Sequence, residues 1–332
     1  MRPSFLPSST SAILRVALLL ATTALVSAKQ YPKDFVVLTS IDPEKQFFSR
    51  TPKEGERVTI SRTKGTSWDK TSLFVNEIVT NKDGSFEGTR ISTDDAVKYC
   101  GGKPALFCVH GFLTEPKDFL EASLDAQKQN DDRNYKSKII PVVWPSMPWN
   151  PNPLDWYKDV KYVGSEGAAN AFKQLGELSS KFQNKSIMTH SMGNRVLMLA
   201  ADPKFKFQNI FMVGADVDKD LFDEGNKDGE QILDMLSSSG KLCVVKNAKD
   251  LLLLASSVGG LLTFNTQVRL GLTGANTSSM STQNKLKIEN EDAGQWESVT
   301  SARKCLPSRQ SALDSHLYLY NDEALAFYDK QI

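Results

Sequence analysis

Residues 35–93 contain short runs in which apolar and polar positions alternate or apolar residues predominate. Runs of this kind, rich in β-branched and aromatic residues, are typical of β-strands. They are FVVLTS, RVTISRT, LFVNEIV and SFEGTRI, and the NKDG at 81–84 is a common hairpin turn. The pattern therefore predicts a β-rich segment in this part of the chain.

From about residue 104 onward, short apolar runs alternate with longer segments of helical periodicity. The apolar runs are ALFCVHGF, KIIPVVW, SIMTHS, NIFMVGA and LCVV, and the helical segments cover 115–130, 157–182, 192–201, 218–237 and 250–263. The segment 157–182 has an amphipathic stripe that consists of Ala168, Ala171, Phe172, Leu175, Leu178 and Phe182. Apolar strands that alternate with helices indicate an α/β fold whose mostly parallel sheet has helices on both faces.

We expect one domain over residues 29–332, in which the β-rich segment 29–99 leads into a core at 100–332. The apolar run LLLLASSVGGLLTF at 251–264 is shorter than the roughly 20 residues that a membrane-spanning helix needs. We interpret this run as a buried helix of the core.

Residues 1–28 differ in composition from the rest of the chain. Arg2 and Arg15 supply positive charge, VALLLATTAL at 16–25 is a short apolar stretch, and Val26-Ser27-Ala28 offers small residues where a signal peptidase cleaves. This pattern predicts a signal peptide that is removed after Ala28. The protein is then expected outside the cell or in the lumen of the secretory pathway, with no stable membrane insertion after cleavage.

Secretion affects how the cysteines are interpreted, because disulfides form in oxidising compartments. Four cysteines allow up to two disulfides in three possible pairings, and they are Cys100, Cys108, Cys243 and Cys305. Cys108 and Cys243 lie within apolar runs, where cysteine is often a buried thiol, so the pairing stays open. The cysteines and histidines do not have the spacing of a zinc site, and we expect no metal.

Charge gives little indication of a macromolecular partner. The 332 residues include 40 Lys+Arg and 39 Asp+Glu, for a formal net charge of +1. A near-neutral chain has no electrostatic reason to bind nucleic acid, so a nucleic-acid partner is not expected.

The stretch SIMTHSMGNRVLML at 186–199 places a serine where an apolar run ends and a helical pattern begins. A serine on such a strand-to-helix corner is either a catalytic nucleophile or the cap of an ordinary turn. The catalytic corner has small residues two positions before and after the serine. Around Ser191 these positions hold Thr189 and Gly193, so the pattern is T-H-S-M-G instead of G-x-S-x-G.

A nucleophilic serine needs a base, which is usually histidine. The chain has three histidines. His190 adjoins the serine and should point the opposite way, and His110 ends a strand well before it. His316 lies downstream, where the order Ser…Asp…His puts the base, so we predict His316 in that role.

The reaction also needs two backbone N–H groups that stabilise the oxyanion. One comes from the residue after the nucleophile, which is Met192. The other comes from the turn after an earlier strand, where His110-Gly111 permits a tight turn, and we assign it to Phe112.

Several spaced motifs of this chain resemble those of the α/β-hydrolases, specifically an esterase-like group of unknown function. The resemblance covers roughly residues 100–325 and rests on FCVHGF, PVVWPS, THSMGNRVL, ADVDKDLF, NAKDLLLLAS, RLGLTG and SHLYLY. It implies an eight-stranded, mostly parallel sheet and a Ser-Asp-His triad, and it does not name a substrate.

The acid of the triad has more than one candidate. Asp250 follows the strand LCVV, and similar enzymes carry the acid in the corresponding loop. Asp216 and Asp218 follow the preceding strand and are alternatives, unless they only cap the next helix. Chain order favours Asp250.

These residues predict a serine hydrolase that cleaves a small-molecule carboxylic ester without metal or organic cofactor. The loop WPSMPWNPNPLDW carries Trp144, Trp149 and Trp156, which either rim an apolar acyl pocket or pack around the prolines. One alternative is a non-catalytic binding protein with the same fold. Another is a lipase acting at a membrane surface, for which the polar segment 274–300 is the candidate lid.

Overall fold

The computed structural model describes residues 35–41, 57–60, 72–80, 86–111, 114, 116–144, 166–259, 268–296 and 319–332. Within these ranges the strands form a ten-stranded sheet in the order β10-β9-β8-β7-β5-β6-β1-β3-β4-β2. The strands are β1 (Phe35–Ile41), β2 (Arg57–Ile60), β3 (Ser72–Thr80), β4 (Phe86–Arg90), β5 (Ala105–Val109), β6 (Lys138–Val143), β7 (Lys185–His190), β8 (Phe207–Val213), β9 (Leu236–Lys246) and β10 (Ile288–Asp292).

Every neighbouring pair from β10 to β1 is parallel, and β3, β4 and β2 then join in antiparallel fashion. This is the mostly parallel α/β arrangement predicted from the sequence. The sheet exceeds the expected eight strands because the N-terminal β-rich segment extends it, with β1 paired to β6.

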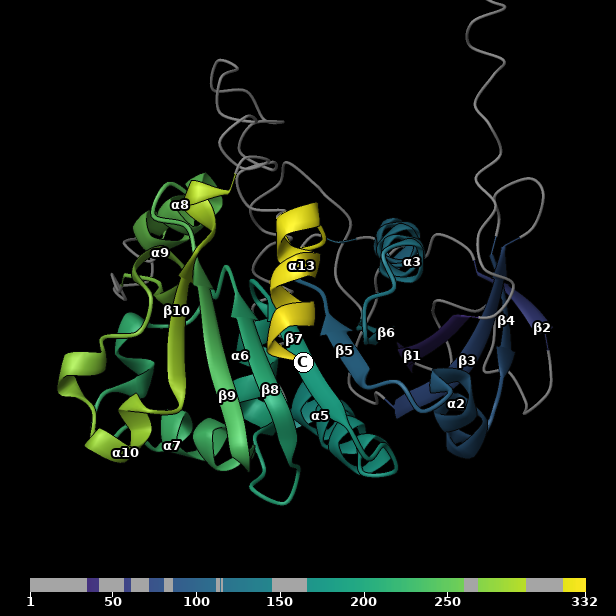
Figure 1. Cartoon of the computed structure of the whole chain (residues 1–332), viewed down its shortest axis with the longest axis horizontal. Helices are drawn as coiled ribbons and strands as arrows, with labels where there is room; N and C mark the ends of the chain where they lie inside the picture. Colours follow the sequence, from purple (N-terminus) through teal and green to yellow (C-terminus); the bar gives the residue numbers. More distant parts are fainter. Residues whose placement is uncertain are drawn as a thin grey trace, which may run out of the picture.

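Helices cover both faces of the sheet (Figure 1). They are α2 (Thr93–Cys100), α3 (Pro116–Asp132), α5 (Glu166–Ser179), α6 (Gly193–Ala200), α7 (Lys227–Asp234), α8 (Leu251–Gly259), α9 (Leu270–Thr273), α10 (Thr282–Lys285) and α13 (Asp322–Gln331), with short 3₁₀ helices at η1 (Lys219–Phe222), η3 (Thr277–Ser279) and η4 (Ala293–Gln295). α8 and α9 lie near the carboxyl ends of β9 and β10, and α7 and α10 lie near the amino ends of these strands.

Two hydrophobic clusters fill the space between the sheet and its helices. Alternate residues of β5 belong to different clusters: Phe107 packs on the side of α5 and α6, and Leu106 packs on the side of α3 and α13. Since successive side chains of a strand point to opposite faces, a strand buried on both sides consists almost wholly of apolar residues. This is the physical reason why the apolar runs predicted the central strands correctly.

Among the described residues are elements that the apolar pattern missed, including α2, β10 and α13. α2 is signalled by Ser92, whose hydroxyl accepts a bond of 3.2 Å from the Asp95 N–H. The edge strand β10 has the sequence IENED, in which Ile288 alone is buried, so no apolar run marks it. In addition, the helix expected over 218–237 is interrupted and forms η1 and α7.

Residues 251–259 of the apolar run form the helix α8, which is only partly buried. Leu253 is 1% exposed, whereas Leu251 is 42% and Leu254 is 41% exposed, so the expectation of a buried helix holds for one face of α8 only. No helix among the described residues combines the length and the apolar character needed to span a membrane.

Three of the four cysteines are described, and all three are buried free thiols: Cys100, Cys108 and Cys243. Burial raises the pKa of Cys100 to about 11 and the pKa values of Cys108 and Cys243 to about 12. The interpretation of Cys108 and Cys243 as core thiols is confirmed. Cys305 lies outside the described residues.

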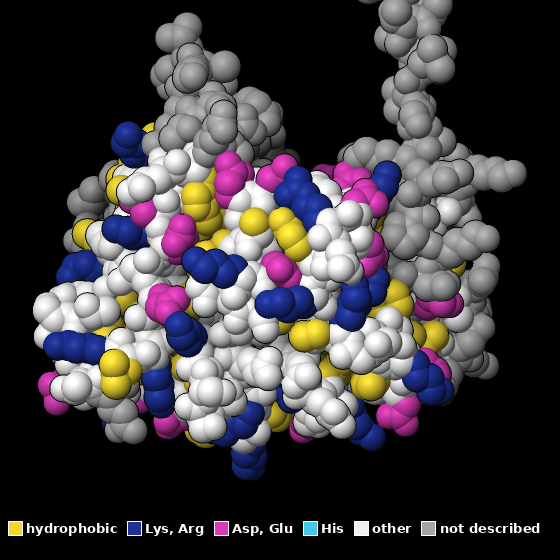
Figure 2. All heavy atoms as spheres, in the orientation of Figure 1, with side chains coloured by type: hydrophobic (Ala, Val, Ile, Leu, Met, Phe, Trp, Pro, Cys, Tyr) yellow, Lys and Arg dark blue, Asp and Glu magenta, His cyan; other side chains and the backbone are white. Residues whose placement is uncertain are grey.

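The surface in Figure 2 shows basic and acidic side chains interspersed over the visible face, with no extended field of one sign. This agrees with the formal net charge of +1. The expectation that the protein has no nucleic-acid partner stays a prediction.

Candidate active site

Ser191 lies at the corner between β7 and α6, with β5 and β8 on either side of β7. Its φ angle is 52°, a left-handed conformation that non-glycine residues rarely adopt. Such strain, on the order of 1–3 kcal/mol, persists where the surrounding structure enforces it, and it clusters at functional sites. The strained strand-to-helix corner expected for a nucleophile is therefore present.

Two glycines allow the neighbouring segments to approach this corner. A Cβ atom on Gly193 would lie 2.7 Å from the main-chain oxygen of His110, and a Cβ on Gly111 would lie 2.7 Å from the Cβ of Ser191. Both distances are too short for any side chain. The turn after β5 therefore packs directly against the serine, as the oxyanion-hole hypothesis requires, although Phe112 itself lies outside the described residues.

Thr189 departs from the small residue expected at its position, and the structure shows how it is accommodated. Its side chain is 1% exposed, and its hydroxyl donates a 2.6 Å hydrogen bond to Oδ1 of Asn194. The Asn194 amide in turn donates to the main-chain oxygens of Thr189 and Ser191, at 3.1 and 3.0 Å. A polar pair therefore joins the strand and the helix here, and sequence reasoning missed the part that Asn194 plays in it.

Met192 immediately precedes α6 and is 3% exposed. Its backbone N–H makes no hydrogen bond to another main-chain group within the described part of the chain. The first N–H groups of a helix have no intrahelical partner and carry partial positive charge. The oxyanion role of the Met192 N–H stays a prediction that is compatible with this position.

His110 is a structural histidine. Its ring stacks on Trp144 at a centroid distance of 5.0 Å, and its two ring nitrogens lie 2.7 Å from Gly111 O and 2.8 Å from Trp144 O. Burial lowers its pKa to about 4, so the ring is neutral near pH 7. These contacts agree with the rejection of His110 as the base. His316 lies outside the described residues, and its role as base stays a prediction.

The stacking also bears on the two alternatives that the sequence left open for Trp144, a pocket rim or packing. Trp144 is fully buried, and its indole N–H donates to the main-chain oxygen of His110 at 2.8 Å. Trp144 therefore packs in the core and cannot rim a substrate pocket. Trp149 and Trp156 lie outside the described residues.

Asp216, at the carboxyl end of β8, is held by groups from three other segments. Ser256 of α8 donates to its Oδ1 at 2.7 Å, Arg269 Nε lies 3.0 Å from the same oxygen, and Arg195 of α6 contacts Oδ2 at 3.2 Å. The Asp216 N–H lies 3.3 Å from the main-chain oxygen of Ser191. Both carboxylate oxygens are thus engaged in a mostly buried ionic cluster beside the corner.

Asp218 pairs with Arg269 Nη1 at 2.8 Å, and its side chain is 42% exposed. It precedes η1 but makes no side-chain capping bond there. Asp218 therefore does not cap η1, and the side chains of both aspartates bind arginines instead.

Asp250 is fully buried in the turn between β9 and α8. Its Oδ1 accepts hydrogen bonds from the N–H groups of Leu252 and Leu253, at 3.1 and 3.0 Å, so this aspartate caps a helix.

β7, β8 and β9 are adjacent, parallel strands, and Ser191, Asp216 and Asp250 each follow the carboxyl end of one of them. The three residues therefore lie on the same side of the sheet, where these strands end. Chain order still favours Asp250 as the acid. A second reason is that Arg195 and Arg269 bind the carboxylate of Asp216.

We predict that Asp216→Asn lowers the free energy of unfolding by about 3–5 kcal/mol, because it leaves the buried Arg269 without its full countercharge. Asp218→Asn is the matched control. It removes a partner of the same arginine at a more exposed position and should lower stability by about 1 kcal/mol or less. Chemical denaturation of both variants tests this, and equal losses would contradict the buried-cluster interpretation.

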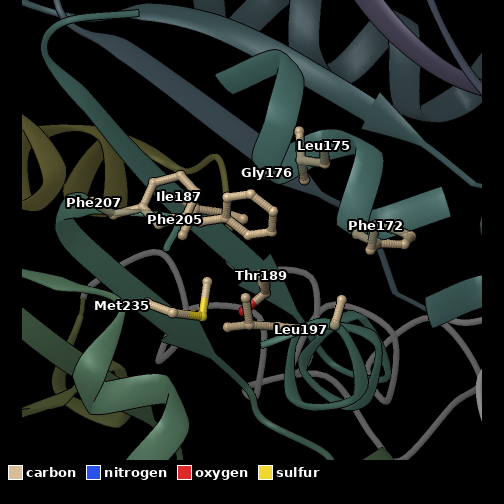
Figure 3. A pocket seen from close by; sticks show the side chains of 10 residues that line it. Phe172, Leu175, Gly176, Ile187, Thr189, Leu197, Phe205, Phe207 and Met235 are labelled. Carbon is tan, nitrogen blue, oxygen red and sulfur yellow. The ribbon is translucent and has the colours of Figure 1, made fainter. Parts of the chain in front are cut away.

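Two cavities among the described residues lie away from the serine. The cavity in Figure 3 lies on the α5 and α6 side of β7, is lined mainly by apolar side chains, and has a volume of about 10 Å³, which is room for about one water molecule. The other has a volume of about 110 Å³ and is lined by residues of α7, α10 and the segments before them. It lies near the amino ends of the strands, whereas Ser191 follows the carboxyl end of β7. Neither is the substrate site of a reaction at Ser191.

The segment 274–300 is the candidate lid of the lipase alternative, although it is hardly apolar enough for that role. Residues Ile288–Asp292 of this segment pair in parallel with Leu242–Lys246 of β9 and are part of the sheet. This pairing argues against a lid that includes residues 288–292.

Comparisons with known proteins add little to these observations. No family model matches the chain, and no curated protein matches it. One similar solved structure is a ferulic acid esterase, with 12% sequence identity and a TM-score of 0.36 over 91% of this chain and 99% of that chain. A likeness of this degree carries no argument about activity, so the functional argument rests on the residues of the site.

Proposed function

We propose that the protein is a serine hydrolase that cleaves a carboxylic ester through an acyl-enzyme intermediate on Ser191. The observation that carries the proposal is the positive φ of Ser191 at the corner between β7 and α6, directly against Gly111. The alternative role of the serine as a turn or helix cap has less support, since α6 begins without a side-chain capping bond.

In the proposed reaction, the base removes the proton of the Ser191 hydroxyl while the oxygen attacks the ester carbonyl. His316 is the proposed base, and Asp250 is proposed to orient its imidazole. The N–H groups of Met192 and Phe112 stabilise the oxyanion, and the protonated base then donates its proton to the leaving alcohol. Water, activated by the same base, releases the acid product and restores the serine.

The test is covalent labelling of the purified protein with a fluorophosphonate probe, followed by peptide mass analysis. We expect a single adduct on the peptide that contains Ser191. A protein that folds but takes up no probe would instead support the non-catalytic binding protein, because an unactivated serine does not react.

We further propose secretion, based on the composition of residues 1–28. Protein made in a secretory host should begin at Lys29, and N-terminal sequencing determines this. Cytosolic protein that begins at Met1 would contradict the proposal.

A further inference from the structure

The main chain of Ser191 is held on both sides by hydrogen bonds. Its N–H donates to Val213 O at 3.0 Å, and its own oxygen lies 3.1 Å from the Asn194 N–H and 3.0 Å from the Asn194 side-chain amide. The Asp216 N–H approaches the same oxygen at 3.3 Å. A strained residue keeps its conformation only when its surroundings fix it, and these bonds do so here.

Asn194 is the side chain that makes this arrangement specific. It is fully buried, and its amide N–H₂ binds the main-chain oxygens of Thr189 and Ser191, the residues just before and at the corner. One side chain therefore ties together the end of β7, the strained residue and the first turn of α6.

Thr189 determines which way the Asn194 amide faces. Its hydroxyl lies 2.6 Å from Asn194 Oδ1 and 3.5 Å from Phe211 O, so the short contact to the amide oxygen takes the proton. With the amide oxygen bound to Thr189, the N–H₂ group must face the two main-chain oxygens. The threonine that weakens the sequence motif thus has a role that glycine at this position does not have.

We infer that Asn194, oriented by the Thr189 hydroxyl, is a positioning residue that fixes the main chain of Ser191 and so aims its hydroxyl at the substrate. This inference rests on the proposed function. It predicts that loss of either side chain slows the reaction of Ser191, although neither residue contacts the substrate.

The experiment compares the saturation kinetics of the fluorophosphonate probe with Thr189→Val, Thr189→Ser and Asn194→Ala variants of the mature chain. The control is Ser186→Ala, which removes an equally buried hydroxyl from the same strand. Valine keeps the shape of threonine without its hydroxyl, and serine restores the hydroxyl. Thermal melting shows that each variant is folded during the measurement.

We expect the maximal labelling rate to fall by on the order of 10²-fold in Asn194→Ala and measurably in Thr189→Val, because a small misplacement of a reacting group has an effect of this size. The probe concentration at half-saturation should not change, and Thr189→Ser and Ser186→Ala should label as the wild type does. A loss of packing alone would lower the melting temperature without this selective loss of rate.

The inference is overturned if the wild type labels at Ser191 and either Thr189→Val or Asn194→Ala labels as fast as Ser186→Ala. Absence of labelling in the wild type overturns the proposed function first. The two failures are therefore distinguishable in one set of measurements, and either of the two variants suffices if the other does not fold.

Discussion

Ser191→Ala is expected to reduce ester hydrolysis to the background rate, a loss on the order of 10⁶ in turnover by comparison with a well-studied serine hydrolase. The reason is that no other group in the mechanism can form the acyl-enzyme. Hydrolysis of an activated ester and fluorophosphonate labelling measure the loss. Ser186→Ala, on the strand β7 that leads to the corner, should keep wild-type activity, and full activity in Ser191→Ala would exclude the serine mechanism.

Ser191→Gly separates the chemical role of this residue from its conformational strain. A left-handed conformation costs a non-glycine residue about 1–2 kcal/mol, so replacement by glycine removes this cost. Glycine in turn lowers stability by about 0.5–1 kcal/mol, because it has more conformational freedom in the unfolded chain. The glycine variant should therefore be inactive but as stable as the alanine variant or more so, by about 0–1.5 kcal/mol. Denaturation curves of the two variants test this, and a glycine variant clearly less stable than the alanine variant would contradict strain at φ 52°.

Asp250→Asn should lower turnover by about 10⁴ if this aspartate orients the imidazole, as an isosteric amide does in the chymotrypsin-type example. Its effect on stability should be small. Asparagine caps helices about as well as aspartate, so its oxygen can still accept the N–H groups of Leu252 and Leu253. Activity assays together with thermal melts measure both quantities.

Asp250→Ala and Asp216→Asn are the informative comparisons. The alanine variant loses the cap as well as the charge and should also lose about 1 kcal/mol of stability. Asp216→Asn should be the less stable protein but should keep its turnover below its melting temperature. If Asp216→Asn loses turnover and Asp250→Asn does not, the acid lies one strand earlier. Full activity in both, and in Asp218→Asn as well, would require a Ser-His dyad or another acid.

The sequence determined the central strands and the position of the serine, because both depend on local patterns. A strand buried on both faces is usually apolar along its length, as β5 (ALFCV) is at every position. β7 (KSIMTH) is also buried at every position, although Lys185, Ser186, Thr189 and His190 are polar. The corner at Ser191 follows from the end of one such strand directly before a helix. Edge strand β10 escaped prediction for the opposite reason, since IENED is mostly not buried and carries no apolar run.

Tertiary structure alone decided the roles of the polar residues around the corner. Asp216 is bound by Arg195, Ser256 and Arg269, which come from separate segments, and only the packing of those segments reveals that this carboxylate is engaged. Thr189 in the sequence is only a departure from a motif, whereas in the fold its hydroxyl orients Asn194. Local periodicity indicates which residues are buried. Hydrogen-bond partners depend instead on the distances between segments, and those distances are fixed only once the chain has folded.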